Sequence, residues 1–552
     1  MEFMDILGKI VSLLAGCGLF MLGFKLLSTN MEKLAGNGLK TFFNKISNNK
    51  LLGLFVGMFT TVVIQSSSVT TVMVVGFVNS GIMSLVQAAS VIIGANIGTT
   101  ITSYIAALSS GADIVADLLN YLFLACLFIG VFVEMFSKKS RVQSLGLILA
   151  GLGAVFMGLD AMSGSMKFLQ AIPEVQSFIG SLDNPFVLLA IGIGFTAIVQ
   201  SSSAVTSIIV IIAATNVLAF GGSGNAVYFL ILGSNIGTCI TAMLSSVGAS
   251  TNARRASMIH LLFNTFGALI FTVVLLAWPG FSETLIESWI AEKQWQIAIF
   301  HTIFNVTCAI IFLPLSKYLV KLASILVKDK DENEKPVYEL AFMDKRLFSS
   351  PHIAVDMLNK DIFRMADLSI DTLKFSFEHF VKRDDSVIDE IEKRTENITK
   401  LGENITNALV SVSSTHGELS LEKTINNLHT HVGDIVRIAE LAENLGKYTR
   451  KEVKESLFFS EDILIKLNEM VELIYEQYKY VKLTCLENMT QYAEMVNEYE
   501  DRIDNMRREL VKAHMERLSQ GKCKPENNAV FINLVSNLER IGDHLQFIAQ
   551  KN

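Results

Sequence analysis

Long apolar runs alternate with short polar breaks in residues 1–327, whereas residues 343–552 place apolar residues at helical spacing. A helix rises about 1.5 Å per residue and a hydrocarbon core is about 30 Å thick, so a membrane span needs about 20 apolar residues. Seven runs in the first part reach this length and predict transmembrane helices. They cover Ile6–Leu27, Leu85–Ala106, Asp117–Phe136, Gln143–Met162, Ala226–Ser245, Ala256–Trp278 and Trp295–Leu319.

Two further apolar stretches, Leu51–Asn79 and Phe186–Asn216, are each interrupted by the polar tetrad Gln-Ser-Ser-Ser. The tetrads occupy Gln65–Ser68 and Gln200–Ser203, and the segments on either side are too short to cross a bilayer. In lipid, a broken helix is tolerated only where it is buried in protein or lines a cavity. We therefore expect two re-entrant hairpins, each made of two half-helices. Paired short segments of this kind indicate the binding site of a transporter.

The two tetrads belong to a wider internal repeat. Residue numbers rise by 135 between the copies up to Gln65 and Gln200, and the motif Gly-x-Asn-Ile-Gly-Thr follows each tetrad, from Gly94 and from Gly233. Two polar motifs that recur in the same order favour a duplicated site over the alternative, which is close packing of serine-rich spans. The repeats cover residues 6–136 and 143–320.

Charged residues predict the orientation of the repeats, because cytoplasmic loops collect Lys and Arg. Residues 32–50 carry four lysines and one glutamate, whereas their counterparts, residues 167–183, carry one lysine and two acids. This opposite bias predicts inverted repeats. Seven spans then place the N-terminus outside the cell and the C-terminal part in the cytoplasm, with Lys138–Arg141 and Arg254–Arg255 inside and the acidic loop Phe281–Lys293 outside.

Composition divides the chain into two parts. Residues 1–327 contain 15 Lys and Arg against 12 Asp and Glu, and the chain totals of 46 and 53 leave 31 and 41 for residues 328–552. We therefore predict an all-α protein with a membrane domain at 1–327, a linker at 328–342 and a soluble acidic domain at 343–552. The six cysteines form no C-x-x-C motif, so neither a disulfide framework nor a zinc site is predicted.

The tetrads have the chemistry of an oxyanion site. A half-helix that starts at the break directs unpaired N–H groups and the positive end of its dipole at the site, and serine hydroxyls add donors. Neither hairpin core contains Arg or Lys, so an anion would meet no permanent positive charge. Amide, hydroxyl and carbonyl oxygens are hard ligands that suit Na⁺.

The doubled tetrad and the doubled Gly-x-Asn-Ile-Gly-Thr motif resemble those of the type II sodium-dependent phosphate cotransporter family. The resemblance covers about Gly16–Leu319 and implies Na⁺-coupled import of inorganic phosphate by alternating access. Cys239 stands where the first copy has Thr100, so the two sides need not bind ions alike. The phosphate candidates are Gln65, Ser66, Ser67, Ser68, Gln200, Ser201, Ser202 and Ser203, and the sodium candidates are Gln200, Asn235, Thr238, Asn96, Thr99, Thr100 and Thr206.

The soluble part resembles the PhoU family, which implies helical bundles with Glu-x-x-x-Asp metal motifs and a role in regulating transport. In the first bundle Val436 replaces the acid expected before Glu440, so a divalent or iron-type metal is expected only in the second, at Glu500, Asp504, Glu539 and Asp543. Ordinary solvated helix faces are the alternative. Two three-helix bundles are predicted, with helices at Ile388–Leu401, Leu428–Leu445, Ile463–Cys485, Met489–Gln520 and Asn528–Lys551.

A multi-pass transporter of the plasma membrane is therefore the predicted function. A carrier of a different oxyanion, and a membrane-anchored phosphate sensor without net flux, remain as alternatives. The sequence has no Walker A loop and no metalloprotease His pair, and it predicts neither an enzyme nor a nucleic-acid partner. A homo-oligomer and a cytoplasmic regulatory partner are left open.

Overall fold

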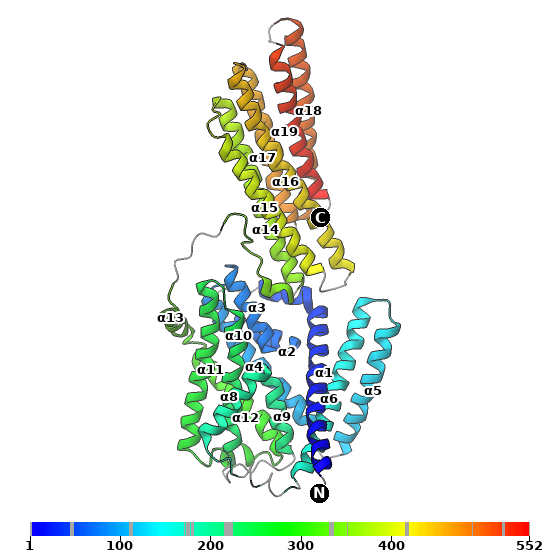
Figure 1. The fold of residues 1–552 in the computed structure, drawn as a ribbon, viewed down its shortest axis with the longest axis vertical. Helices are drawn as coiled ribbons and strands as arrows, with labels where there is room; N and C mark the ends of the chain where they lie inside the picture. Colours follow the sequence, from blue (N-terminus) through cyan, green and yellow to red (C-terminus); the bar gives the residue numbers. More distant parts are fainter. Residues whose placement is uncertain are drawn as a thin grey trace. The chain divides into compact units, whose positions relative to one another are not determined.

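The chain divides into two compact units, which we call the membrane unit and the soluble unit. The membrane unit comprises residues 1–332 and 345–350, and the soluble unit comprises residues 333–344 and 351–552. Residues 330–335 of the predicted linker and parts of the segments 32–50 and 167–183 lie outside the described residues. The computed structural model (Figure 1) describes residues 3–44, 49–109, 114–170, 172, 177, 181–214, 225–329, 336–349, 351–413, 419–487, 489–521 and 525–550.

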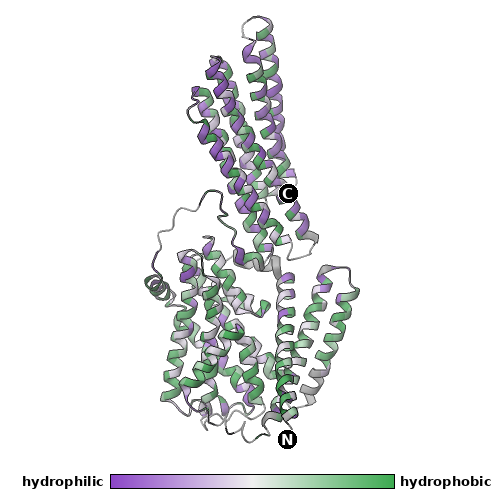
Figure 2. Ribbon diagram, viewed as in Figure 1, coloured by the Kyte–Doolittle hydropathy of each residue, from purple (hydrophilic) through white to green (hydrophobic). Residues whose placement is uncertain are grey.

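Apolar helices build the membrane unit, and Figure 2 colours them mostly green. Within the described residues, six helices are long and apolar enough to cross a bilayer. The helices are α1 (Phe3–Asn44), α2 (Lys50–Ile64), α3 (Ser67–Asn79), α4 (Leu85–Ser109), α5 (Ile114–Phe136), α6 (Ser140–Gln170), α8 (Pro185–Val199), α9 (Ser202–Ala214), α10 (Ala226–Ser245), α11 (Thr251–Ala277), α12 (Lys293–Phe312) and α13 (Ser316–Leu326).

Six of the seven predicted spans correspond to these long apolar helices, which are α1, α4, α6, α10, α11 and α12. The seventh corresponds to α5, whose described apolar part is Tyr121–Phe136. Each predicted hairpin is a pair of short helices, α2 with α3 and α8 with α9. The polytopic all-helical architecture with two broken hairpins is therefore confirmed.

The predicted boundary of the last span, Trp295–Leu319, is wrong. Helix α12 ends at Phe312, a turn covers residues 313–315, and α13 begins at Ser316 as a separate helix. Pro314 lies in this turn; proline has no backbone N–H and its ring clashes with the preceding helical turn, so it ends the span. The apolar character of the sequence continues through the turn, which is why the hydropathy pattern did not reveal it.

The packing of the membrane unit follows the repeat. In the first copy α2 packs on α4, and in the second α8 packs on α10. The second half-helices also contact the other copy: α3 packs against α10 and α11, and α9 packs against α4. One apolar core includes Tyr228 and Phe300, whose rings stack with centroids 3.9 Å apart.

Six long helices build the soluble unit, and Figure 2 shows polar faces along them. They form two three-helix bundles, one of α14, α15 and α16 and the other of α17, α18 and α19. Helix α14, which the sequence analysis did not delimit, completes the first bundle. Helix α18 is shorter than predicted, and α15, α16, α17 and α19 are longer. The helices are α14 (Pro351–Lys382), α15 (Ile388–Ser413), α16 (Leu419–Lys454), α17 (Glu461–Cys485), α18 (Ala493–Ser519) and α19 (Glu526–Gln550).

One carboxylate of the soluble unit is buried beside a single arginine. Glu452 on α16 is only 3% exposed and is held by Arg383, whose Nε lies 3.3 Å from its Oε1. Arg383 adopts a left-handed backbone (φ 57°) at the end of α14 and stacks over the ring of Phe458. Burial raises the pKa of Glu452 to about 7, although the guanidinium of Arg383 opposes this rise.

We predict that the soluble unit loses stability as the pH rises from about 4.5 to about 7. Over this range the folded state binds the Glu452 proton more tightly than the unfolded state, so raising the pH favours unfolding. Circular-dichroism melting of residues 333–552 should show a melting temperature that falls by a few degrees over this interval. Glu452→Gln should flatten this dependence, whereas Glu455→Gln, at an exposed position three residues further, should retain it. An unchanged pH profile in Glu452→Gln would contradict the assignment.

Candidate functional site

Both hairpins begin in the same way. The Asn49 side chain accepts hydrogen bonds from the N–H groups of Leu51 (3.0 Å) and Leu52 (3.4 Å) and so caps α2. Asn184, which is the corresponding residue in the second copy, caps α8 through Phe186 and Val187. An asparagine at this position satisfies helix N–H groups that would otherwise lack partners.

Each first half-helix ends at the glutamine of its tetrad. Gln65 has φ 58° and ψ 24°, and Gln200 has φ 57° and ψ 24°. Both lie in the left-handed region, which is unfavourable for a residue other than glycine. Their N–H groups donate 2.7 Å hydrogen bonds to the carbonyl oxygens of Thr61 and Thr196, respectively. The two breaks therefore have the same backbone geometry and the same strain.

The first serine of each tetrad starts the second half-helix. The Oγ of Ser66 accepts a hydrogen bond from the N–H of Val69 at 3.3 Å, and the Oγ of Ser201 accepts one from Ala204 at 3.2 Å. These two hydroxyls are N-caps. The serines that follow, including Ser67 and Ser202, lie in the first turns of α3 and α9, where the first N–H groups have no partner within the helix.

Matching hydroxyls in α3 and α9 are buried without hydrogen-bond partners in the described part of the chain. They belong to Thr71 and Thr206, which occupy equivalent positions of the two copies and are at most 1% exposed. A buried hydroxyl without a partner is costly, so such a pair at equivalent positions indicates groups that bind a ligand or ordered water. Thr206 is one of the predicted sodium ligands, whereas Thr71 is not among them.

Helices α4 and α10 pass unbroken through the Gly-x-Asn-Ile-Gly-Thr motifs. The glycines serve close approach to the first half-helices: a Cβ on Gly94 would lie 2.0 Å from the carbonyl oxygen of Leu54, and one on Gly233 would lie 2.1 Å from that of Leu189. No side chain fits at these crossings. The motifs thus hold α2 and α8 tightly against the spanning helices that carry the sodium candidates.

The asparagines of these motifs have the same geometry in both copies. The Nδ2 of Asn96 donates to the carbonyl of Ile92, and that of Asn235 donates to Ile231, each at 2.9 Å. The amide groups are therefore oriented by their own helices. Both residues are only 4% exposed. Their side-chain nitrogens make these bonds, so each side-chain oxygen keeps acceptor lone pairs for a cation.

The threonines that follow are also bonded to their own helices. Thr99 donates to the carbonyl of Ala95 and Thr238 to that of Ser234, both at 3.0 Å, and Thr100 donates to Ile97 at 2.8 Å. A hydroxyl that donates its proton in this way still has acceptor lone pairs for a ligand.

The two glutamines differ in their side chains. The Oε1 of Gln65 accepts a 3.2 Å hydrogen bond from Thr102 on α4, and its Nε2 donates to the carbonyl of Val62. Gln200 is exposed, and Thr241, the counterpart of Thr102, has a buried hydroxyl without a partner among the described residues. Sequence reasoning missed both threonines. They recur three residues beyond the motif in each copy, and this signal could have found them.

Comparisons with known proteins identify the families that the two units resemble. Residues 19–164 and 170–286 match the family model described as Na⁺/Pi-cotransporter. The membrane unit belongs to this family. Residues 362–449 and 467–551 match the PhoU domain, one match in each bundle of the soluble unit. The chain is thus a multi-pass membrane protein of a phosphate transporter family with a PhoU-like soluble unit.

Similar proteins from several organisms match this chain over different lengths. YjbB of Escherichia coli (strain K12), whose name assigns it provisionally to inorganic phosphate export, is 23% identical over 96% of this chain and 95% of its own length. YqeW of Bacillus subtilis (strain 168), named as uncharacterized, is 28% identical over 56% of this chain and 96% of its own length. The human sodium-dependent phosphate transport protein 2B is 37% identical over 20% of this chain and 16% of its own length. No solved structure matches.

In the second PhoU-like bundle, the predicted metal ligands on α18 and α19 lie close enough for their charges to affect one another. Burial, and next the charge of Asp543, raise the pKa values of Glu500 and Glu539. Arg508 pairs with Asp504, however, and the Nε of Arg507 lies 3.9 Å from Glu539. Within the described residues, no group of three or more His, Cys, Asp or Glu is placed to hold a metal ion. The metal site therefore stays a prediction.

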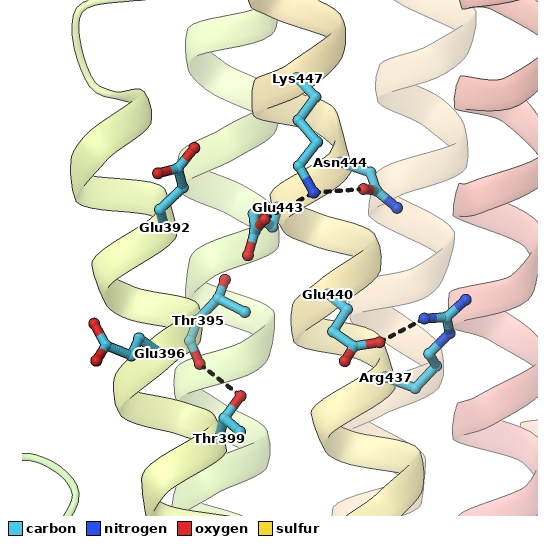
Figure 3. Close-up of a pocket in the computed structure, with 9 residues that line it drawn as sticks. All are labelled: Glu392, Thr395, Glu396, Thr399, Arg437, Glu440, Glu443, Asn444 and Lys447. Carbon is cyan, nitrogen blue, oxygen red and sulfur yellow. Dashed lines mark hydrogen bonds and ion pairs between the residues drawn. The ribbon is translucent and has the colours of Figure 1, made fainter.

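A pocket of about 460 Å³ lies in the first PhoU-like bundle, between α15 and α16 (Figure 3). Three of its acids are paired: Arg437 contacts Glu440, the Nζ of Lys447 lies 2.8 Å from Glu443, and the Nζ of Lys400 lies 2.6 Å from Glu396. Sequence reasoning missed Glu443, because it considered only the motif positions 436 and 440 on this helix. The lining residues are Glu392, Thr395, Glu396, Thr399, Arg437, Glu440, Glu443, Asn444 and Lys447.

Two glycines on α8 test the role of close helix packing. A Cβ on Gly192 would lie 2.4 Å from the carbonyl oxygen of Leu230, whereas one on Gly194 would meet no atom within 4 Å. Gly192→Ala should therefore destabilise the membrane unit by about 1–3 kcal/mol through overpacking. Gly194→Ala should be neutral or slightly stabilising, because alanine is the better helix former. Thermal unfolding of the purified protein in detergent measures both, and equal melting temperatures would contradict the proposed packing.

Proposed function

We propose that this chain is a sodium-coupled secondary active transporter that imports inorganic phosphate by alternating access. The observation that carries the proposal is the equivalence of the two hairpin breaks, with a left-handed Gln and a serine N-cap at each. Each break directs the N-terminus of a half-helix, with its free N–H groups and partial positive charge, at the same kind of ligand. That ligand is an oxyanion, since helix N-termini bind phosphate without a charged side chain.

The phosphate ligands in this proposal are the backbone N–H groups and hydroxyls of Ser67, Ser68, Ser202 and Ser203. Ser66 and Ser201 position the half-helices through their capping bonds, and Gln65 and Gln200 border the site. Without a permanent positive charge, phosphate can leave again, which a carrier requires and a high-affinity sensor does not.

Most of the proposed Na⁺ ligands are oxygens on α4 and α10, the helices that pack against the broken hairpins. Asn96, Thr99 and Thr100 offer them on α4, and Asn235 and Thr238 offer them on α10, together with Thr206 and Gln200. Packing of α3 on α10 and of α9 on α4 supports this assignment, because it combines the tetrad of one copy with the motif of the other. A human relative named as a sodium-dependent phosphate transport protein supports sodium as the coupling ion.

A specific observation favours a second candidate, which is phosphate export. The relative that matches nearly the whole chain has a name that refers to export of inorganic phosphate. A Na⁺-coupled carrier moves phosphate along the total driving force, so an inward Na⁺ gradient favours import.

We also propose that the N-terminus is outside and the soluble unit cytoplasmic, since the exposed Lys138 and Lys139 lie in one predicted inner loop.

Flux measurements in proteoliposomes test the main proposal. Phosphate uptake should require an inward Na⁺ gradient and stop when K⁺ replaces Na⁺. Ser67→Ala and Ser202→Ala should each lower uptake at least about tenfold, which corresponds to the loss of about 1.4 kcal/mol of binding or transition-state energy. Ser288→Ala, at an exposed hydroxyl far from the tetrads in sequence, is the matched control. Uptake that is indifferent to Na⁺ would reject coupling, and Na⁺-driven efflux alone would favour export.

Regulation by the soluble unit is part of the proposal, and the short 3₁₀ helix η2 (Lys345–Ser349) supports it. Arg346 donates hydrogen bonds to the carbonyls of Ser245 and Val247 at the end of α10. Leu347 is fully buried and contacts α3 at Gly76. These contacts lie within the membrane unit, and the chain continues from η2 directly into α14. A segment covalently attached to the soluble unit therefore holds the second half-helix of the first hairpin.

Deletion of residues 351–552 should change the rate of phosphate uptake, and the change should depend on η2. In an Arg346→Ala/Leu347→Ala background the same deletion should have little further effect, because the connection to α3 is already lost. Lys345→Ala, at an exposed residue of the same segment, should leave the effect of the deletion intact. Unchanged uptake after the deletion, at both low and high external phosphate, would contradict regulation by the soluble unit.

A further inference from the structure

Helix α13 (Ser316–Leu326) lies across the direction of the spanning helices, as Figure 1 shows by viewing it nearly end-on. It follows α12 after the turn at Pro314. One face, with Ser316, Leu319 and Ala323, is buried against α11 and α4. These residues are three and four positions apart and so share one side of the helix. Val320 and Leu322 also pack against the apolar core, whereas Tyr318 and Ile325 are exposed.

A second face of α13 is apolar and exposed. Tyr318 is 70% exposed and Ile325 is 61% exposed, and Leu315 and Leu326 at the ends of the helix are 42% and 55% exposed. Positions 315, 318 and 325 share a face because they are separated by three and seven residues. Three large apolar side chains on an 11-residue helix, with Leu315 just before it, need a hydrocarbon environment or a protein partner to cover them.

A third face is basic. Lys317 and Lys321 are one helical turn apart, and Lys328 follows the end of the helix seven residues after Lys321. All three are exposed, and in the described part of the chain none forms an ion pair. The basic face adjoins the apolar one, which is the arrangement of a helix that lies in a membrane interface.

Two other cationic side chains, Lys50 and Arg255, form bonds at the two ends of α13 and are therefore already engaged within the protein. The Nζ of Lys50 lies 3.2 Å from the carbonyl oxygen of Pro314, just before the helix. Arg255 donates to the carbonyl of Val327 at 3.1 Å and pairs with Asp329 at 2.9 Å, just after it. The orientation of the three faces is therefore fixed by bonds at both ends of the helix.

We propose that α13 is an interfacial helix that binds anionic phospholipid headgroups through Lys317, Lys321 and Lys328, with its apolar face among the acyl chains. The helix directly follows a membrane span, so its level is that of the membrane surface. The acidic soluble unit is a rival occupant, since residues 328–552 carry 31 basic against 41 acidic side chains. An acidic helix face would match the lysines but would leave Tyr318 and Ile325 uncovered, whereas a phospholipid matches both faces.

Fluorescence quenching by brominated lipids tests this proposal on the full-length protein. Tyr318→Trp places a reporter at an exposed position of the apolar face, and the signal of the three native tryptophans is subtracted using the unsubstituted protein. The variant is reconstituted into phosphatidylcholine vesicles that contain either brominated phosphatidylcholine or brominated phosphatidylglycerol. Both lipids should quench Trp fluorescence at position 318, and phosphatidylglycerol should do so at a lower fraction of the membrane. Each lysine near an anionic membrane surface contributes about a fivefold preference for anionic over neutral phospholipid.

Lys317→Gln/Lys321→Gln in the reporter background should lower the preference for phosphatidylglycerol several-fold while quenching by phosphatidylcholine persists. Lys138→Gln/Lys139→Gln removes two exposed lysines from the loop between α5 and α6 and should keep the preference. Absence of quenching by either lipid would show that protein covers the apolar face and would overturn the proposal. Equal quenching by the two lipids, or a preference that survives in Lys317→Gln/Lys321→Gln, would overturn the role of the lysines.

Discussion

Backbone N–H and carbonyl groups cannot remain unpaired in hydrocarbon, and this constraint governs the membrane unit. A helix that stops halfway across the membrane exposes such groups at the break. Here the left-handed glutamine returns its N–H to the preceding turn, and the next serine caps the following helix. What stays unsatisfied is a small set of donors and hydroxyls at equivalent positions, and these are the groups that a transported ion can use.

The two copies share a backbone but differ in part of their side-chain chemistry. Gln65 is bonded to Thr102, whereas Gln200 is exposed and Thr241 has no partner among the described residues. Thr100 is matched by Cys239, whose thiol lies 3.4 Å from the amide nitrogen of Asn264. A duplicated scaffold with different oxygen ligands on its two sides is suited to binding an anion symmetrically and cations asymmetrically.

Sequence reasoning succeeded where polar residues interrupt apolar runs and failed where the pattern was continuous. The tetrads and both hairpins were predictable because two short apolar segments cannot each cross a bilayer. The end of the last span was mispredicted, since apolar residues continue on both sides of Pro314. Glu443 was missed because the expected motif lay within one helix, whereas the pocket forms between α15 and α16.

The sequence by itself determined the repeat, the two broken hairpins, the helical soluble unit and the types of residue at the breaks, because these depend on local composition and spacing. Only the tertiary structure decided that α3 joins α10 and α9 joins α4, that motif glycines serve helix contact, and that Thr102 binds Gln65. Such pairings join residues that are distant in the chain, and no local pattern of hydropathy records which apolar surfaces meet.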